Sequence, residues 1–263
     1  MVPRLLALDF DGVLCDGMDE FFESARRGLA DVTGKTVPDA LHGRFAGLRP
    51  AVESGWEMVA LIGMLAESDG SEDRALRQAR TWATARDRYL ASHGLDRRRL
   101  TLALDGARDR WIAGNLADWL RSHRFYPGVV RWLTDLTRTE LPVYIISTKG
   151  KPFLEALLTG QGVHMPPDRV IGKEEPRREK WDVLRDLAQA NGVAFADVWF
   201  VEDRLPTLLE MRERAPDLRA RLFFASWGFV FPERDSAAAR EESIPVLDLA
   251  TMTGPFAAWP STA

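Results

Sequence analysis

Four short apolar runs along the chain each end at polar or glycine residues. They are Leu5–Leu8, Val143–Ile146, Val198–Val201 and Leu222–Ala225. Continuous apolar runs of this length are typical of strands that are covered on both faces. Between the later runs, apolar residues recur near the 3.6-residue period of a helix, in residues 150–160, 177–191 and 205–214. This alternation predicts an α/β fold with a Rossmann-like parallel sheet and helices on both faces.

Residues 17–125 follow a different pattern, because amphipathic helical segments succeed one another without a convincing strand. One of these helices is expected to start at Ser71 and to stop at Gly94. We interpret 17–125 as an all-helical domain inserted after the first strand, and residues 1–16 plus 126–263 as the core domain. The tail after Leu249 is rich in Pro, Gly, Ala and Thr and is predicted to lie loosely on the surface.

Composition narrows the class of protein. The 263 residues are 46% hydrophobic and 28% charged, with a net charge of −4, as in a soluble globular protein. A mildly acidic chain without a basic stripe is a poor candidate for binding nucleic acid or an anionic membrane. No apolar run is long enough for a membrane helix, and the single cysteine, Cys15, excludes an internal disulfide. These features favour a cytoplasmic protein.

Acidic residues follow two of the predicted strands. Asp9 and Asp11 lie two residues apart at the end of the first strand, so both side chains are expected to project to one side. Glu202 and Asp203 follow the third strand. Two close carboxylates repel each other unless a cation or a shared proton offsets their charge. Carboxylate and carbonyl oxygens suit Mg²⁺, which often shares its site with a phosphate.

Hydroxyl and amino groups complete this set. Ser147 and Thr148 end the second strand, and Lys180 starts a predicted helix. A single acid or serine at a strand end is most often an ordinary helix cap. Together, however, a carboxylate nucleophile, a carboxyl acid/base, a hydroxyl, a lysine and a magnesium ion suffice for phosphoryl transfer through an aspartyl-phosphate.

The same segments resemble the haloacid dehalogenase-like (HAD) hydrolase superfamily. Its first motif resembles DFDGVL at 9–14, its second resembles IIST at 145–148, and its fourth resembles VED at 201–203. STKGKPFLEALL is similar to the helix start of phosphoglycolate phosphatase relatives, and ASWGF at 225–229 to a segment that follows the next strand. The helical insertion resembles the C1 cap by its position. DFDGVLCDG, LRP…GWEM, RFYPGV and FVEDRL also resemble a group of uncharacterised HAD proteins from cyanobacteria and plants.

This resemblance implies a role for each matching residue. Asp9 would attack phosphorus, and Asp11 would protonate the leaving oxygen and later activate water. Ser147 would hydrogen-bond the phosphoryl group, and Lys180 would balance its charge. Mg²⁺ would be held by Asp9, the backbone carbonyl of Asp11, and Asp203. The further candidates for phosphate or substrate binding are Gly12, Thr148, Lys149 and Arg49.

Two positions depart from the family pattern. Many members have a second aspartate four residues after the first in the last motif, where this chain has Thr207. Glu202 is therefore expected to take the role of the second metal-binding acid, directly or through water. Lys173 also precedes the same helix as Lys180. We favour Lys180 as the catalytic lysine because Leu184 and Leu187 follow it with helical spacing.

The sequence thus predicts a Mg²⁺-dependent phosphoric monoester hydrolase that acts on a small phosphorylated metabolite. A phosphomutase with the same intermediate is an alternative, since only the acceptor of the phosphoryl group differs. A third alternative is a binding or regulatory protein that keeps the fold without catalysis, because fold alone does not establish activity. Substrate identity and oligomeric state stay open at this stage.

Overall fold

The chain forms two compact units in the computed structural model, which describes residues 2–173, 178–216 and 220–261. One unit combines Met1–Asp16 with Arg124–Ala263, and the other is Gly17–His123. No helix among the described residues is both long enough and apolar enough to cross a membrane.

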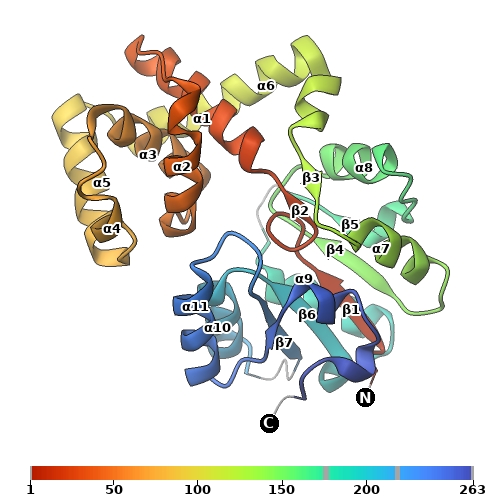
Figure 1. Ribbon diagram of the computed structural model, residues 1–263. Coiled ribbons are helices and arrows are strands. Elements are labelled where there is room, and N and C mark those ends of the chain that lie inside the picture. Colours follow the sequence, from red (N-terminus) through yellow and green to blue (C-terminus); the bar gives the residue numbers. More distant parts are fainter. Residues whose placement is uncertain (1, 174–177, 217–219, 262–263) are drawn as a thin grey trace. The chain divides into compact units, whose positions relative to one another are not determined.

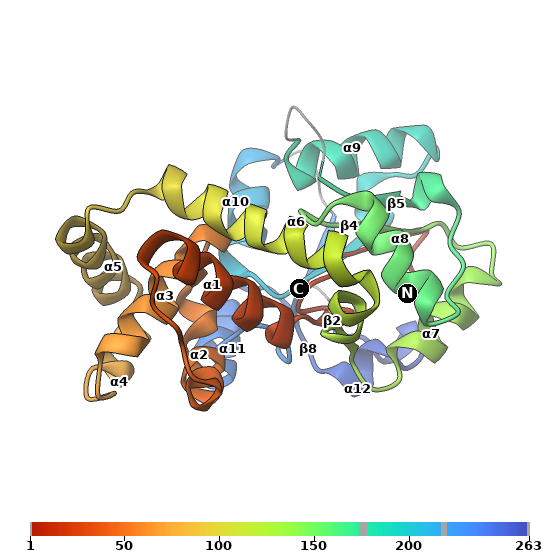
Figure 2. The same ribbon diagram turned by 90° about the horizontal axis from the view of Figure 1, so that it is seen from above.

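The first unit is built on one parallel sheet, which has six strands within the described residues. The strand order is β5-β4-β1-β6-β7-β8; Figure 1 labels all of these strands except β8, which Figure 2 labels. The strands are β1 (Leu5–Leu8), β4 (Val143–Ile146), β5 (Val170–Ile171), β6 (Val198–Glu202), β7 (Arg221–Ala225) and β8 (Val246–Leu247). β1 lies at the centre, with Leu6 opposite Val143 on one side and Leu5 opposite Val198 on the other. The predicted α/β fold with a helical insertion is confirmed.

The helices that follow β5 and β6 pack on one face of this sheet. Alternate strand residues such as Leu5, Phe200 and Phe224 pack there against Leu184 of α9 and Leu208 of α10. The helices of this unit are α7 (Val129–Thr137), α8 (Lys151–Gly160), α9 (Lys180–Ala190), α10 (Leu205–Arg214), α11 (Pro232–Glu241) and α12 (Leu249–Met252), with 3-10 turns at Pro167–Arg169, Phe195–Asp197 and Phe256–Ala258. Residue 177, where one predicted helix begins, lies outside the described residues.

The C-terminal tail packs on the sheet, so the prediction that it lies loosely on the surface is wrong. Trp259 is only 5% exposed. Its ring lies 5.3 Å from that of Trp199 on β6 and 5.0 Å from that of Phe223 on β7. Phe256 joins the same cluster. Two aromatic rings in a Pro- and Ala-rich tail bury enough apolar area to hold it in place.

A two-stranded antiparallel ribbon joins β1 to the rest of the unit. It pairs β2 (Cys15–Asp16) with β3 (Arg124–Phe125), and the ring of Phe125 meets Phe10 edge-on at 5.6 Å. Because β3 falls inside 17–125, the prediction that this region has no strand is wrong at its last residues. Strands of two residues are too short to show an alternating pattern.

The second unit is helical. Its helices are α1 (Met18–Thr33), α2 (His42–Leu48), α3 (Gly55–Glu67), α4 (Asp73–Leu76), α5 (Ala79–His93) and α6 (Arg97–Arg121), with 3-10 turns at Asp39–Leu41 and Arg49–Ala51. α1 packs against α3 and α6. Gly28 brings α1 within 3.3 Å of the α6 backbone at Ala103, measured from the position of a Cβ. A buried ion pair from Arg108 to Glu20 links the same two helices.

The helix expected from Ser71 to Gly94 is broken into α4 and α5, so its predicted start is wrong. The stop is confirmed, because Gly94 caps α5 in the left-handed region with φ 59°. Gln78 between the two helices is extended. Leu76 and Trp82 are both buried. A straight helix would set these two residues roughly 120° apart around its axis, so the break allows both to turn inwards.

Candidate functional site

The carboxyl ends of β4, β1 and β6 are neighbours and bring the predicted polar residues to one edge of the sheet. The backbone N–H of Asp9 donates to the carbonyl of Val201, and that of Ser147 donates to Ile171, so the parallel pairing runs to the ends of these strands. Asp9, Ser147 and Asp203 are all buried. In open α/β sheets this edge is where ligands bind.

Lys180 lies between two of the acids. Its Nζ is 2.9 Å from Asp9 Oδ1 and 2.6 Å from Glu202 Oε2. Lys180 is the first residue of α9, and Glu202 is the last residue of β6 and fully buried. The other oxygen of Glu202 accepts from the backbone N–H of Arg204 at 3.0 Å. The structure therefore joins Lys180 to both carboxylates.

Burial and mutual repulsion govern the protonation of this cluster. Burial and Glu202 raise the pKa of Asp9 to about 7, although Lys180 opposes the shift. Burial, Glu202 and Asp9 raise the pKa of Asp203 well above its ordinary value. Burial also disfavours the charged form of Glu202, but Lys180 and the hydrogen bonds from Asp203 and the Arg204 backbone together outweigh it and lower the pKa of Glu202.

A divalent cation fits this donor set. Asp9, Glu202 and Asp203 are buried, and each offers one oxygen such that the three lie within 4.8 Å of one another. The raised pKa values of Asp9 and Asp203 show that burial and mutual repulsion disfavour their charged forms, and a bound cation would relieve both effects. Oxygen-only donors suit Mg²⁺ among the common divalent ions.

Two glycines allow Asp203 to sit in the site. Asp203 Oδ2 accepts from the backbone N–H of Phe229 at 2.7 Å. A Cβ on Gly12 would lie 2.0 Å from that oxygen, and one on Gly228 would lie 2.5 Å from it. Gly12 also adopts φ 86°, which favours glycine. Sequence reasoning missed Gly228 and Phe229 as site residues, and the glycine of ASWGF was the available signal.

Lys149 approaches the second acid of the first strand end. Its Nζ lies 3.3 Å from Asp11 Oδ1, in an ion pair whose alignment is not that of a hydrogen bond. Ser147 Oγ accepts from the backbone N–H of Lys149 at 3.1 Å. Thr148, between them, is exposed. The backbone N–H of Lys173 donates to the carbonyl of Lys149, so Lys173 lies beside the same loop.

Arg49 belongs to the helical unit. Its guanidinium lies 4.9 Å from the ring centre of Phe21 and donates to the carbonyl of Val52 at 3.1 Å. Its role toward a substrate stays a prediction.

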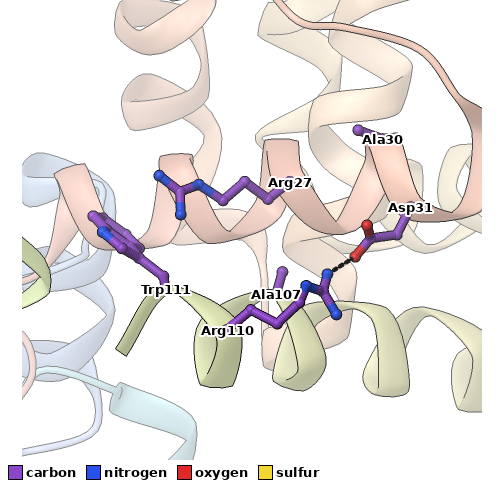
Figure 3. A pocket seen from close by; sticks show the side chains of 6 residues that line it. All are labelled: Arg27, Ala30, Asp31, Ala107, Arg110 and Trp111. Carbon is purple, nitrogen blue, oxygen red and sulfur yellow. Dashed lines mark hydrogen bonds and ion pairs between the residues drawn. The ribbon is translucent and has the colours of Figure 1, made fainter. Parts of the chain in front are cut away.

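A pocket of about 270 Å³ lies between α1 and α6 of the helical unit (Figure 3). Arg110 pairs with Asp31 across it, and the guanidinium of Arg27 lies 4.4 Å from the ring centre of Trp111. None of the predicted site residues lines this pocket. Arg110 pairs with Asp31 and Arg27 pairs with Glu23, so these charged groups already have partners and we do not assign the chemistry to this pocket.

Comparison with known proteins identifies the family. The model of the haloacid dehalogenase-like hydrolases matches residues 3–213. The fold described above, a parallel α/β sheet with a helical insertion and acids at the carboxyl ends of its central strands, agrees with this match. The chain belongs to the haloacid dehalogenase-like hydrolase family. No curated protein sequence matches the chain significantly.

Solved structures share the fold at low identity. A predicted phosphatase from Clostridium acetobutylicum has a TM-score of 0.61 and 16% identity, with 96% of this chain and 97% of that chain covered. A haloacid dehalogenase-like family hydrolase from Streptococcus pneumoniae has a TM-score of 0.58 and 17% identity, with 94% of each chain covered. A predicted phosphoglycolate phosphatase from Haemophilus somnus has a TM-score of 0.55 and 15% identity, with 87% of each chain covered.

Proposed function

We propose that this protein is a Mg²⁺-dependent phosphatase that hydrolyses a small phosphorylated metabolite through an aspartyl-phosphate intermediate. The observation that carries the proposal is the buried cluster of Asp9, Lys180, Glu202 and Asp203. Family membership is consistent with this chemistry. We also retain the interpretation of the helical unit as a cap domain, with Arg49 as a candidate substrate contact.

Asp9 is the nucleophile in this proposal. Its Oδ1 is held by Lys180 at 2.9 Å. In the first step an Asp9 oxygen forms a bond to phosphorus while the bond from phosphorus to the ester oxygen breaks. A carboxylate can perform this step only when ionised, and the ammonium of Lys180 favours that form against burial.

Asp11 is the acid and base. In the first step its carboxyl proton passes to the departing ester oxygen, so that the product leaves as an alcohol. In the second step the Asp11 carboxylate takes a proton from water, and the water oxygen attacks phosphorus. The bond from phosphorus to Asp9 then breaks, which releases inorganic phosphate and restores the Asp9 carboxylate. General acid–base catalysis of this kind contributes about 10²–10⁴-fold.

Ser147 and Lys180 stabilise the phosphoryl group. Ser147 carries a hydroxyl at the end of β4, and Lys180 brings a positive charge beside Asp9. The backbone around Gly12, together with Thr148, supplies further candidate donors to phosphate oxygens. Charge stabilisation in a site that excludes water is commonly the largest contribution to catalysis.

Mg²⁺ would be held by Asp9 and Asp203, with the backbone carbonyl of Asp11, and by Glu202 directly or through water. When bound, a divalent cation neutralises negative charge on the phosphoryl oxygens. Glu202 also has a second role in the proposal, because its contact at 2.6 Å anchors Lys180.

The substrate is an expectation drawn from relatives. A short phosphorylated acid such as 2-phosphoglycolate belongs in any first panel, because one structural neighbour is described as a predicted phosphoglycolate phosphatase. The resemblance to the cyanobacterial and plant group stays a prediction.

The test is phosphate release from a panel of phosphorylated metabolites with Mg²⁺. We expect Asp9→Asn to lower the rate by at least about 10³-fold, as expected for loss of a nucleophile. Asp135→Asn is the matched control, since Asp135 lies exposed on α7 and should keep the wild-type rate. A wild-type protein that is folded, binds Mg²⁺ and releases no phosphate from any compound would contradict the proposal. So would an Asp9→Asn variant as active as wild type.

A further inference from the structure

Each of the two first-strand acids has its own lysine. Lys180 contacts Asp9, and Lys149 contacts Asp11 through an ion pair of 3.3 Å between Nζ and Oδ1. The Lys149 side chain is 9% exposed and that of Asp11 is 21% exposed. Partial burial weakens screening by water, so this pair is stronger than an ion pair on an open surface.

The fold pins the backbone of Lys149 from two sides. Its N–H donates to Ser147 Oγ at 3.1 Å, and its carbonyl accepts from the N–H of Lys173 at 2.9 Å. Gly172 packs so closely that a Cβ there would lie 2.7 Å from the Lys149 carbonyl and 2.4 Å from the Lys151 nitrogen. A lysine held at its backbone loses less conformational freedom when it fixes a partner.

Asp11 itself has little else to fix its carboxyl group. Its Oδ1 is enclosed by protein and accepts no hydrogen bond from any residue that the structure describes. Asp11 follows the end of β1, where the chain turns through Gly12 at φ 86°. The charge of Lys149 is therefore the described interaction that holds Asp11 Oδ1 in place.

We propose that Lys149 is the positioning residue of Asp11. Its ammonium holds Asp11 Oδ1 as an ion pair when Asp11 is ionised and as a charge–dipole contact to the carbonyl oxygen when Asp11 is protonated, and it thereby fixes the orientation in which Asp11 protonates the departing ester oxygen. This inference rests on the proposed phosphatase function and on the acid role of Asp11 within it. It differs from the sequence-based expectation that Lys149 binds phosphate or substrate. In this role Lys149 acts only through Asp11. Its loss should therefore lower kcat most for substrates whose leaving group must be protonated.

Leaving-group dependence separates this role from direct binding. An alkoxide is a poor leaving group and needs a proton, whereas p-nitrophenolate leaves readily without one. The test compares kcat and KM for two esters. The leaving group of glycerol 3-phosphate is an alkoxide that must be protonated, and that of p-nitrophenyl phosphate is p-nitrophenolate. Lys149→Met should lower kcat for glycerol 3-phosphate by about 10- to 100-fold and kcat for p-nitrophenyl phosphate by less than about 3-fold.

Three further variants sharpen the test. Lys149→Arg keeps the positive charge and should restore part of the lost kcat. Lys149→Met in an Asp11→Asn background should change the remaining activity by less than about 2-fold, because residues acting as a unit are not additive. Lys151→Met is the matched control, since Lys151 begins α8, is 42% exposed and faces Glu155. It should retain wild-type kinetics.

Other results overturn the inference in distinguishable ways. Equal losses of kcat with both esters, or a rise in KM alone, would mean that Lys149 binds the phosphoryl group or the substrate directly. A further large loss in the Asp11→Asn background would mean that Lys149 acts without Asp11. A wild-type enzyme inactive on both esters and on the metabolite panel would remove the proposed function, and this inference with it. Circular dichroism of each variant verifies that it is folded.

Discussion

Replacing Trp259 with alanine tests whether the C-terminal tail is an integral part of the sheet unit. A buried tryptophan removes about 150–250 Å² from water, which is worth roughly 4–6 kcal/mol at about 25 cal/mol per Å². Trp259 Nε1 has no hydrogen-bond partner among the described residues, a defect that offsets about 1–3 kcal/mol of this gain. We therefore expect Trp259→Ala to lower the free energy of unfolding by about 3 kcal/mol.

The assay is urea unfolding followed by far-UV circular dichroism. Trp259→Phe is the matched control, because a phenyl ring keeps contact with Trp199 and Phe223 while it removes the buried N–H. Its loss should stay below about 1.5 kcal/mol. If Trp259→Ala unfolds within about 0.5 kcal/mol of wild type, the tail contributes nothing to the sheet and the packing argument fails.

Three further predictions concern other parts of the molecule. Gly228→Ala should abolish activity, because the added Cβ would lie 2.5 Å from Asp203 Oδ2, whereas Gly160→Ala, where nothing lies within 4 Å, should be neutral in the same phosphate-release assay. Tyr89→Phe should keep or raise the thermal midpoint, because the buried Tyr89 hydroxyl has no hydrogen-bond partner among the described residues; a clear drop would reveal one. Removal of divalent metal with EDTA should abolish phosphate release, and added Mg²⁺ should restore it; activity that survives EDTA would contradict the metal requirement.

The main strands could be predicted because strands buried on both faces appear in the sequence as continuous apolar runs. Leu5–Leu8 and Val143–Ile146 are strands with the predicted bounds. β5 and β8 contain two residues each, and no pattern of two residues distinguishes a strand from a loop. These two strands form because the edge of an existing sheet offers free backbone hydrogen-bonding groups. This depends on the tertiary structure and not on the local sequence.

The residues of the candidate site that follow the ends of strands could be predicted from the sequence. Asp9, Ser147 and Asp203 follow adjacent strands, so parallel pairing alone brings them to one edge. Helical spacing favoured Lys180 over Lys173, and Lys180 is the lysine that contacts Asp9. Contacts between loops could not be predicted in this way, because they depend on how closely two backbones approach.

The charges of the buried cluster favour the binding of a divalent cation over an empty site. Asp9, Glu202 and Asp203 provide three carboxylates, and Lys180 provides one positive charge beside two of them. Fully ionised, the cluster carries two surplus negative charges in a buried place, which water cannot screen. Protons relieve that charge when no metal is bound, as the raised pKa of Asp203 indicates. A divalent cation would neutralise the same surplus and would leave Asp9 ionised, as the proposed nucleophile requires. Glu202 therefore contributes one of these negative charges to the site, whether or not it would contact the metal directly.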